Sequence, residues 1–414
     1  MTEAASATAQ PPAALDPARL MQGFPPPPDY RVHLGNWQHW PQKIWSFQHA
    51  GELFGSRRIA RSGAVRPWAV AMADLDDLPV DPDHRWAQVW PATHTDALLV
   101  LHRGRIVDER YLNGMSAAQP HLIFSATKSM AGLMAATLVA EGRLDDAAAV
   151  GALLPELAHS AWADATVRQV MDMTDGVVFT EVYNDPASDI FRYVASMGWV
   201  PQQRHSADPP GILANLATLQ RRHDEPRGSA FRYRSPATDV TAWLATRTAG
   251  QSMSAWLQQR LWQPLGMEAD ASLMLDPQGT EVAFAGMSAT ARDLARLGQL
   301  MLQGGRLDGR QILPAAAVGA IAAGGSTAAF AAGGYAAMNP ARSGWSYRAQ
   351  WWHNPGSPRS FGAYGAFGQR LVVFPDDDLV VVLFGSHPNP MAGAVDPLHL
   401  RAFTALAHHL KDLP

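Results

Sequence analysis

The sequence predicts an α/β plus α fold, in which a sheet flanked by helices carries an inserted helical subdomain. Strand-like segments occur near both ends of the chain, from 96 to 111 and from 345 to 384. The pattern from Val167 to about Met267 is mainly helical. An apolar segment with helical spacing begins at Ser125 and reaches Leu138. We therefore expect one discontinuous sheet domain with a helical part between its halves.

Composition along the chain suggests the domain boundaries. The first thirty residues are rich in alanine and proline and end in the run Pro25–Pro28, which is typical of a flexible arm. This stretch lacks the charged-then-apolar order of a signal peptide, so a cytoplasmic location is expected. We expect the nearby tryptophans at 37, 40 and 45 to pack on the main body. The predicted division is an arm at 1–30, a sheet domain at 31–165 and 268–414, and a helical subdomain at 166–267.

A hairpin and a helix are the clearest single elements. The apolar runs Ala97–Leu101 and Arg105–Tyr111 flank Arg103-Gly104, which predicts a β-hairpin. Apolar spacing predicts a helix over Thr290–Leu302, in which Asp293 can complete a capping box with the first residue.

Strands are expected again in the C-terminal part, where β-branched and aromatic residues gather. The chain should then close with a helix from Pro397. The Ala/Gly-rich segment Pro314–Gly334 stays open between a helix of small residues and a loop. The predicted strands are Trp345–Trp352, Gln369–Phe374 and Leu379–Phe384.

Composition excludes several classes of function. The 414 residues are 47% hydrophobic and 17% charged, with a net charge of −4 and no lysine- or arginine-rich run, so nucleic acid is not an expected partner. There is no cysteine, which excludes disulfides, thiolate metal sites and a cysteine nucleophile. The histidines are scattered, so no metal site is predicted. The apolar helix that ends near residue 140 is about half the length needed to cross a membrane.

The candidate nucleophile is Ser125, three residues before Lys128. Only three of the 33 basic residues are lysines: Lys43, Lys128 and Lys411. Arginine cannot lose its proton in a protein, so a lysine inside an apolar segment suggests a chemical role. Residues three apart share a helix face, and a desolvated lysine can take the proton of a serine hydroxyl. Ser-x-x-Lys by itself is a short pattern that also occurs by chance.

Two further motifs offer partners for this pair. Tyr233 and Ser235 lie two apart in a segment bordered by turn residues, which suits a loop. If that loop faces Ser125, Lys128 would lower the pKa of the Tyr233 hydroxyl, which could then relay a proton. The glycine-rich segment Gly362–Gly368 would let backbone N–H groups face an oxyanion, or it is a hairpin that binds nothing.

These three motifs, in this order, resemble the Ser-x-x-Lys β-lactamase and penicillin-binding-protein superfamily, especially its class C-like branch. Within it, the chain from about Trp37 onward is most similar to 6-aminohexanoate-dimer (nylon oligomer) hydrolases and related β-lactamase-like esterases. The similarity implies a β-lactamase/transpeptidase-like fold with an antiparallel sheet. Its specific stretches are Tyr183–Ser188, Gly198-Trp199, Tyr233-x-Ser235, Thr238–Val240 and Gln350–Trp352.

The resemblance also implies roles for individual residues. Ser125 would be the nucleophile, and Lys128 with Tyr233 the proton-transfer pair. The backbone amides of Ser125 and Ala366 would form the oxyanion hole. The residues implied to contact the substrate are Tyr183, Trp199, Trp352 and Ser235. Trp199 and Trp352 could equally be core tryptophans.

Three departures from the family pattern narrow the range of expected substrates. The Lys-Thr-Gly motif of β-lactamases reads Ala363-Tyr364-Gly365 here, so its cation is missing and a β-lactam is not the expected substrate. Val194 and Phe284 stand where nylon oligomer hydrolases can carry polar groups for an amine end. A more apolar acyl or alcohol portion is therefore expected.

The leading hypothesis is a serine hydrolase that cleaves a small-molecule amide or carboxylic ester through an acyl-Ser125 intermediate, without cofactor or metal. Two alternatives remain: a carboxylesterase with no amide activity, and a binding or sensor protein that is acylated without turnover. A homodimer is left open.

Overall fold

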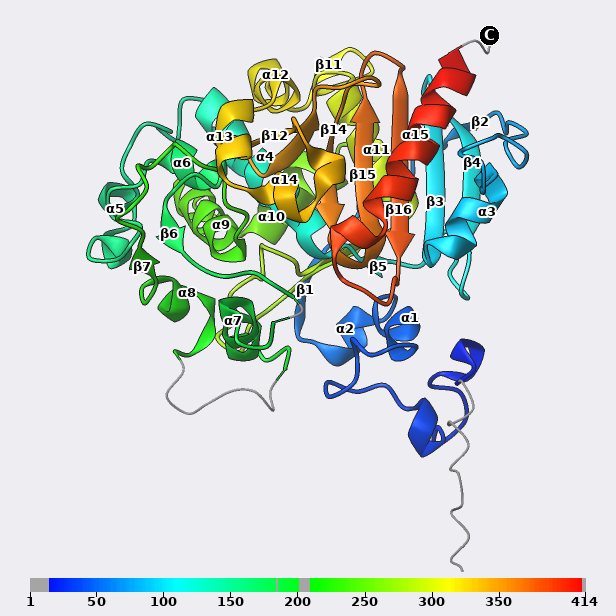
Figure 1. Cartoon of the computed structure of the whole chain (residues 1–414), viewed down its shortest axis with the longest axis horizontal. Helices are drawn as coiled ribbons and strands as arrows, with labels where there is room; N and C mark the ends of the chain where they lie inside the picture. Colours follow the sequence, from blue (N-terminus) through cyan, green and yellow to red (C-terminus); the bar gives the residue numbers. More distant parts are fainter. Residues whose placement is uncertain (1–14, 184, 201–208, 412–414) are drawn as a thin grey trace, which may run out of the picture.

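The structure is a computed structural model that describes residues 15–183, 185–200 and 209–411. An eight-stranded sheet forms its centre, in the order β12-β13-β14-β15-β16-β3-β4-β2 (Figure 1). Its neighbouring strands run antiparallel, except that β2 is parallel to β4. Segments far apart in the sequence therefore share one sheet. Its strands are β2 (Ala69–Val70), β3 (Thr95–His102), β4 (Arg105–Tyr111), β12 (Ser346–Arg348), β13 (Trp351–Asn354), β14 (Ser360–Gly365), β15 (Gln369–Phe374) and β16 (Leu379–Gly385).

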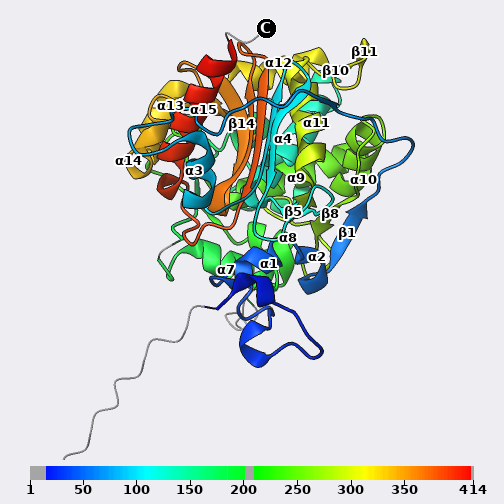
Figure 2. The same ribbon diagram turned by 90° about the vertical axis from the view of Figure 1, so that its right-hand side faces the viewer.

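Helices cover both faces of this sheet. Figure 2 shows α3 and α15 on one side and α4 and α11 on the other. Helix α11 packs on β15, β16 and β3, while α15 packs against α3. The strands β3, β15 and β16 are buried along their whole length, as expected for strands between two helical layers. These helices are α3 (Trp86–Ala92), α4 (Thr127–Ala140), α11 (Ala291–Leu302) and α15 (Asp396–Lys411).

Helices also dominate the stretch between α4 and α11. Helix α9 packs along α4 and joins this part to the sheet layers. Strands β6 (Val177–Val178) and β7 (Gln220–Arg221) pair with each other, and a separate four-stranded sheet has the order β1-β8-β9-β5. The division into two domains stays a prediction. The helices are α5 (Val150–Leu153), α6 (Val167–Met171), α7 (Asp189–Ser196), α8 (Gly211–Leu216), α9 (Ser235–Ala249) and α10 (Met253–Leu257). The strands of the four-stranded sheet are β1 (Ser56–Ile59), β5 (His121–Leu122), β8 (Ala271–Met274) and β9 (Met287–Ala289).

The predicted hairpin is confirmed as β3 and β4, with Arg103 and Gly104 in left-handed backbone conformations at the turn. The helix predicted from Ser125 starts as a turn of 3-10 helix, and the α-helix begins at Thr127. Helix α11 is also confirmed, but only half of its capping box forms. The Thr290 side chain accepts the N–H of Asp293, whose carboxylate instead accepts the backbone N–H groups of Glu268 and Ala269, just before β8.

One sequence expectation is corrected, and one segment that the sequence left open is resolved. The segment Trp345–Trp352 is not one strand, because a turn at Ala349 and Gln350 separates β12 from β13. Both residues have a positive φ without being glycine. The ambiguous segment Pro314–Gly334 forms two helices, α12 (Ala315–Ala323) and α13 (Thr327–Ala332), with Gly324 between them in a left-handed conformation. The chain then continues into α14 (Tyr335–Met338) and a 3-10 turn, η7 (Pro340–Arg342).

Of the N-terminal arm, residues 1–14 lie outside the described residues. The following stretch forms two single-turn 3-10 helices, Pro17–Arg19 and Pro28–Tyr30. Trp37 is buried and donates its ring N–H to the carbonyl oxygen of Trp199 at 3.0 Å, so it packs on the main body as predicted. No helix among the described residues is long and apolar enough to cross a membrane.

Candidate active site

Ser125 lies in the 3-10 turn η3 (Phe124–Ala126), which leads directly into α4. The Nζ atom of Lys128, in the first turn of α4, is 3.1 Å from the Oγ atom of Ser125. The three-residue spacing therefore brings the two side chains together, as the sequence predicts.

The amine of Lys128 is enclosed by protein, since the residue is only 1% exposed. It also lies 3.0 Å from Oγ of Ser235 and 3.0 Å from the carbonyl oxygen of Phe284. Burial lowers the pKa of Lys128 to about 8, although nearby carboxylates act in the opposite direction. Roughly a tenth of the lysine is then neutral at pH 7 and able to accept a proton.

Glu181 is a residue of this site that the sequence patterns did not indicate. Its carboxylate accepts the hydroxyl of Ser235 at 2.8 Å and the backbone N–H of Ser235 at 2.6 Å. Since Ser235 gives its hydroxyl hydrogen to Glu181, its oxygen is free to accept from Lys128. A neutral Lys128 that donates to Ser235 and Phe284 has one lone pair left, and that lone pair faces Ser125. The only signal in the sequence is that Glu181 stands two residues before Tyr183.

A second carboxyl group lies behind the lysine. Asp239 of α9 is buried and accepts a hydrogen bond from the Tyr193 hydroxyl at 2.7 Å. Burial raises the pKa of Asp239 to about 7, while Lys128 acts to lower it. Lys128 thus lies in the field of two carboxyl groups, both of which favour its protonated form.

Tyr233 lies in the loop before α9 and lines the same cavity as Ser125, whose side chain is near enough to influence the pKa of the Tyr233 hydroxyl. The Nζ atom of Lys128 is 5.1 Å from the centre of the Tyr233 ring. The expectation that Lys128 lowers the pKa of this phenol is wrong, because burial raises it well above its ordinary value. Tyr233 is therefore a neutral hydroxyl at physiological pH, which can relay a proton by donating one as it accepts another.

The end of β14 lies against the nucleophile turn. A Cβ atom on Gly365 would collide with the carbonyl oxygen of Ile123, so glycine is required for this approach. The chain then enters the turn η8 (Ala366–Gly368), where Phe367 has a φ of 62°. Ser125 and Ala366 line the same cavity. Their assignment as the oxyanion hole stays a prediction.

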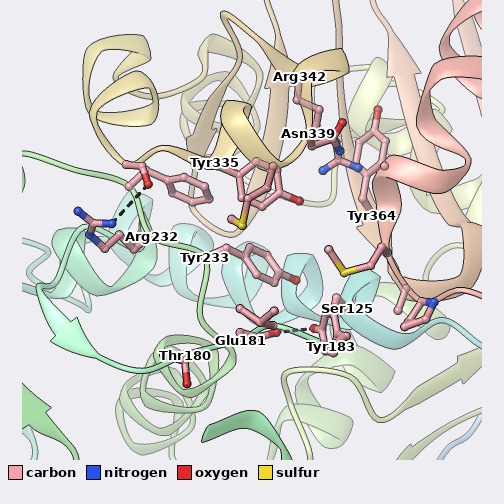
Figure 3. A pocket seen from close by; sticks show the side chains of 18 of the residues that line it. Ser125, Thr180, Glu181, Tyr183, Arg232, Tyr233, Tyr335, Asn339, Arg342 and Tyr364 are labelled. Atoms are coloured by element: carbon pink, nitrogen blue, oxygen red, sulfur yellow. Dashed lines mark hydrogen bonds between the residues drawn. The ribbon is translucent and has the colours of Figure 1, made fainter. Parts of the chain in front are cut away.

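Ser125, Glu181 and Tyr233 line a cavity of about 300 Å³ (Figure 3). Tyr183 and Trp352 line it, and the ring of Trp352 stacks on that of Tyr233 at 5.4 Å between centroids. Tyr183 donates its hydroxyl to Glu181 at 2.5 Å. Ser235 is not among the lining residues, and it contacts Lys128 from behind. The lining also includes Phe179, Thr180, Val182, Arg222, Phe231, Arg232, Tyr335, Met338, Asn339, Arg342 and Tyr364.

The structure does not bring Trp199 into this cavity. Its ring is buried against Phe284 at 5.5 Å and Trp37 at 5.6 Å, so it acts as a core residue behind the lysine. Val194 and Phe284 are also absent from the lining. Phe284 serves the site through its carbonyl oxygen, which accepts from Lys128. No group of three or more potential metal ligands occurs among the described residues.

Comparison with known proteins agrees with this geometry. A sequence model of the beta-lactamase family matches residues 85–406, which is more than half of the chain. The chain belongs to the beta-lactamase family. It is 36% identical over 358 residues to the 6-aminohexanoate-dimer hydrolase of Paenarthrobacter ureafaciens, an alignment that covers 86% of this chain and 88% of that protein.

Solved structures of similar proteins show the same architecture. A candidate 6-aminohexanoate-dimer hydrolase from Bacillus anthracis superposes with a TM-score of 0.83 at 30% identity, covering 94% of this chain and 99% of that one. A penicillin-binding-protein homologue from Caulobacter crescentus gives a TM-score of 0.57 at 19% identity, over 84% and 99% of the two chains. The predicted family, fold and hydrolase class are therefore confirmed.

Proposed function

We propose that this hydrolase cleaves a linear amide of the 6-aminohexanoate-oligomer kind through an acyl intermediate on Ser125. The observation that carries the proposal is the contact of one buried lysine with both Ser125 and Ser235, where Ser125 lines a cavity together with Tyr233. The 36% identical relative is named for such an amide substrate, which supports the choice of substrate class.

In the acylation step, Oγ of Ser125 attacks the carbonyl carbon and its proton passes to the neutral amine of Lys128. The N–H groups of Ser125 and Ala366 would stabilise the negative charge that develops on the carbonyl oxygen. The leaving nitrogen needs a proton before the C–N bond breaks. Tyr233 supplies it and is reprotonated from Lys128, so the amine leaves and the acyl group stays on Ser125.

Deacylation reverses these proton movements. A water molecule attacks the acyl carbon and gives its proton to Lys128, directly or through Tyr233. The bond to Oγ of Ser125 then breaks, the serine recovers its proton and a carboxylic acid is released. No step of this sequence uses a metal or an organic cofactor.

Side-by-side turnover of the 6-aminohexanoate dimer and p-nitrophenyl butyrate tests the proposal. Hydrolysis of both, with an acyl adduct on Ser125 seen by mass spectrometry after a rapid acid quench, is the expected result. Hydrolysis of the ester alone would replace the proposal with the carboxylesterase alternative. A stable adduct without turnover of either substrate would favour the sensor alternative.

Location and assembly remain predictions. The cytoplasmic location rests on the composition of the first thirty residues. A homodimer is the proposed assembly, and analytical ultracentrifugation tests it.

A further inference from the structure

A buried cluster with an excess of positive charge lies beside the catalytic cavity. Arg342 donates to one carboxylate oxygen of Asp396 at 2.7 Å, and Arg370 donates to the other at 2.6 Å. All three residues are no more than 1% exposed. The cluster therefore holds two guanidinium groups and one carboxylate, which leaves one positive charge without a counterion.

Arg342 is the member of this cluster that reaches the cavity, because it alone of the three is a lining residue. Its guanidinium is packed against aromatic rings, 4.3 Å from the centroid of Trp352 and 4.5 Å from that of Tyr364. Its Nη2 atom is buried and has no hydrogen-bond partner. A buried donor on a charged group is costly when unpaired, so this end of the cavity is suited to an acceptor from a ligand.

Two hydroxyl groups stand beside Arg342 with unused hydrogen-bonding capacity. Tyr335 and Tyr364 line the cavity, and within the described part of the chain neither hydroxyl has a hydrogen-bond partner. Burial raises the pKa of both phenols, that of Tyr364 to about 12, so both keep their protons at neutral pH. Figure 3 shows Tyr233 between Tyr335 and Ser125, with Arg342 beside Asn339 and Tyr364 at the end of the cavity away from Ser125.

The other ionisable groups near the cavity do not cancel this charge. Burial lowers the pKa of His399 to about 3, so it is neutral. Glu181 lies with Tyr183 and Ser235 near the nucleophile and is occupied by their hydrogen bonds. Arg232, another lining cation, is already paired with Glu225.

We propose that Arg342, with the hydroxyls of Tyr335 and Tyr364, forms a subsite for a carboxylate carried by the substrate at a distance from the scissile bond. This rests on the proposed function and specifies its substrate class: linear amides or esters that end in an anionic group. The β-lactamase motif position at Ala363 carries no cation, and here the positive charge comes from the turn η7 instead.

Matched ester pairs test this subsite. In one pair, mono-p-nitrophenyl suberate and p-nitrophenyl octanoate differ by a carboxylate on the acyl side. In the other pair, the octanoyl esters of 4-hydroxybenzoate and of its methyl ester differ on the leaving side. We expect kcat/KM to be about tenfold or more higher for the anionic member of at least one pair, as a charged hydrogen bond would give. A kcat/KM ratio near one in both ester pairs would contradict the proposed carboxylate subsite.

Variants then assign the preference to Arg342. In Arg342→Gln the ratio of kcat/KM for the anionic ester to kcat/KM for the neutral ester should fall close to one. The remaining Arg370–Asp396 pair has no net charge, so it should not attract the substrate carboxylate. Tyr335→Phe should lower the ratio by a smaller factor. Arg232→Gln removes another lining cation, and the ratio should not change. A preference that persists in folded Arg342→Gln, as judged by circular dichroism, would contradict the assignment.

A measurement on the unmodified enzyme covers the case in which Arg342→Gln does not fold. Ionisation of the enzyme's catalytic groups changes kcat/KM of both members of one ester pair equally, so it cancels in the ratio of the two values. The pH dependence that remains in this ratio is that of the substrate carboxyl group. The ratio should fall as the pH drops through about 4–5, where a carboxyl group becomes protonated. A ratio that does not change across that range would refute the subsite. Turnover of the 6-aminohexanoate dimer and of the neutral esters would continue in that case, whereas failure of the proposed function would show as no turnover of the dimer.

Discussion

Glu181 holds Ser235 by two hydrogen bonds, one from its backbone N–H at 2.6 Å and one from its hydroxyl at 2.8 Å. This fixes the orientation of the Ser235 hydroxyl and therefore the contacts of Lys128. Glu181 is a positioning residue in the proposed mechanism, because it acts on Ser125 through these two side chains.

The negative charge of Glu181 raises the pKa of Lys128 against the larger effect of burial. In Glu181→Gln the pKa of Lys128 should therefore fall, and the ascending limb of the pH profile of kcat/KM should move to lower pH. Glu225→Gln is the control, since Glu225 pairs with Arg232 and makes no contact with the lysine. A limb that stays in place or moves to higher pH in Glu181→Gln would contradict this role.

Lys128 must lose its proton to act as the base, so kcat/KM of the native enzyme should rise with pH through about 8. Lys128→Arg keeps the positive charge and cannot be deprotonated. We expect a loss of about 10²–10⁴-fold in kcat/KM and no ascending limb near pH 8. Stopped assays from pH 6 to 10 would check both. An arginine variant of nearly native activity would mean that the lysine acts only through its charge.

Ser125→Ala removes the nucleophile while leaving the packing of η3 unchanged. Ester and amide hydrolysis should fall to the rate without enzyme, and no acyl adduct should form. The free energy of unfolding in urea should change by less than about 1 kcal/mol, since no bulky group is lost. Retained hydrolysis would show that another residue is the nucleophile.

Tyr233→Phe should separate amides from activated esters. An amine leaves only after protonation, whereas p-nitrophenolate leaves without a proton. We expect kcat for the amide to fall about 10²–10⁴-fold and kcat for the p-nitrophenyl ester to fall much less. Tyr347→Phe is a suitable control, because Tyr347 is a buried neighbour of Tyr233 that does not line the cavity. Equal losses for both substrates would argue against a proton relay through Tyr233.

Gly132 in α4 should not tolerate a side chain. An added Cβ atom would collide with the carbonyl group of Ala349. Gly132→Ala should therefore destabilise the protein by about 1–3 kcal/mol, despite the higher helix propensity of alanine. Gly319 is an exposed position of helix α12 with open space around it, so Gly319→Ala should stabilise the protein by up to about 1 kcal/mol. Urea unfolding of the two variants gives the comparison.

The contact between Ser125 and Lys128 could be predicted from the sequence because it depends on local helix geometry. The positions of Tyr233 and Ala366 followed from resemblance rather than from any pattern of spacing. Glu181 and Arg342 could not be found in this way, because their partners Ser235 and Asp396 lie 54 positions away in the chain in each case. Such pairings depend on how the elements pack.

The turn at Ala349 and Gln350 was missed for a related reason. Neither residue favours a positive φ, so the sequence contains no turn signal there. Hydrogen bonds from distant elements hold the turn instead: Ala349 donates its N–H to Asp172 at 2.8 Å, and Gln350 accepts from Ser129 at 2.8 Å. The helices at Pro314–Gly334 were ambiguous because small residues carry a weak amphipathic pattern.

The wall formed by α14 and η7 supplies Tyr335, Met338, Asn339 and Arg342 to the cavity, while Ser125, Lys128 and Glu181 come from other segments. This wall is thus encoded in a different stretch of the gene from the nucleophile and its base. Natural selection for a new compound can act on about eight codons of this wall without altering those of the nucleophile. Exchange of the same short stretch between relatives offers a practical route to redirecting the enzyme.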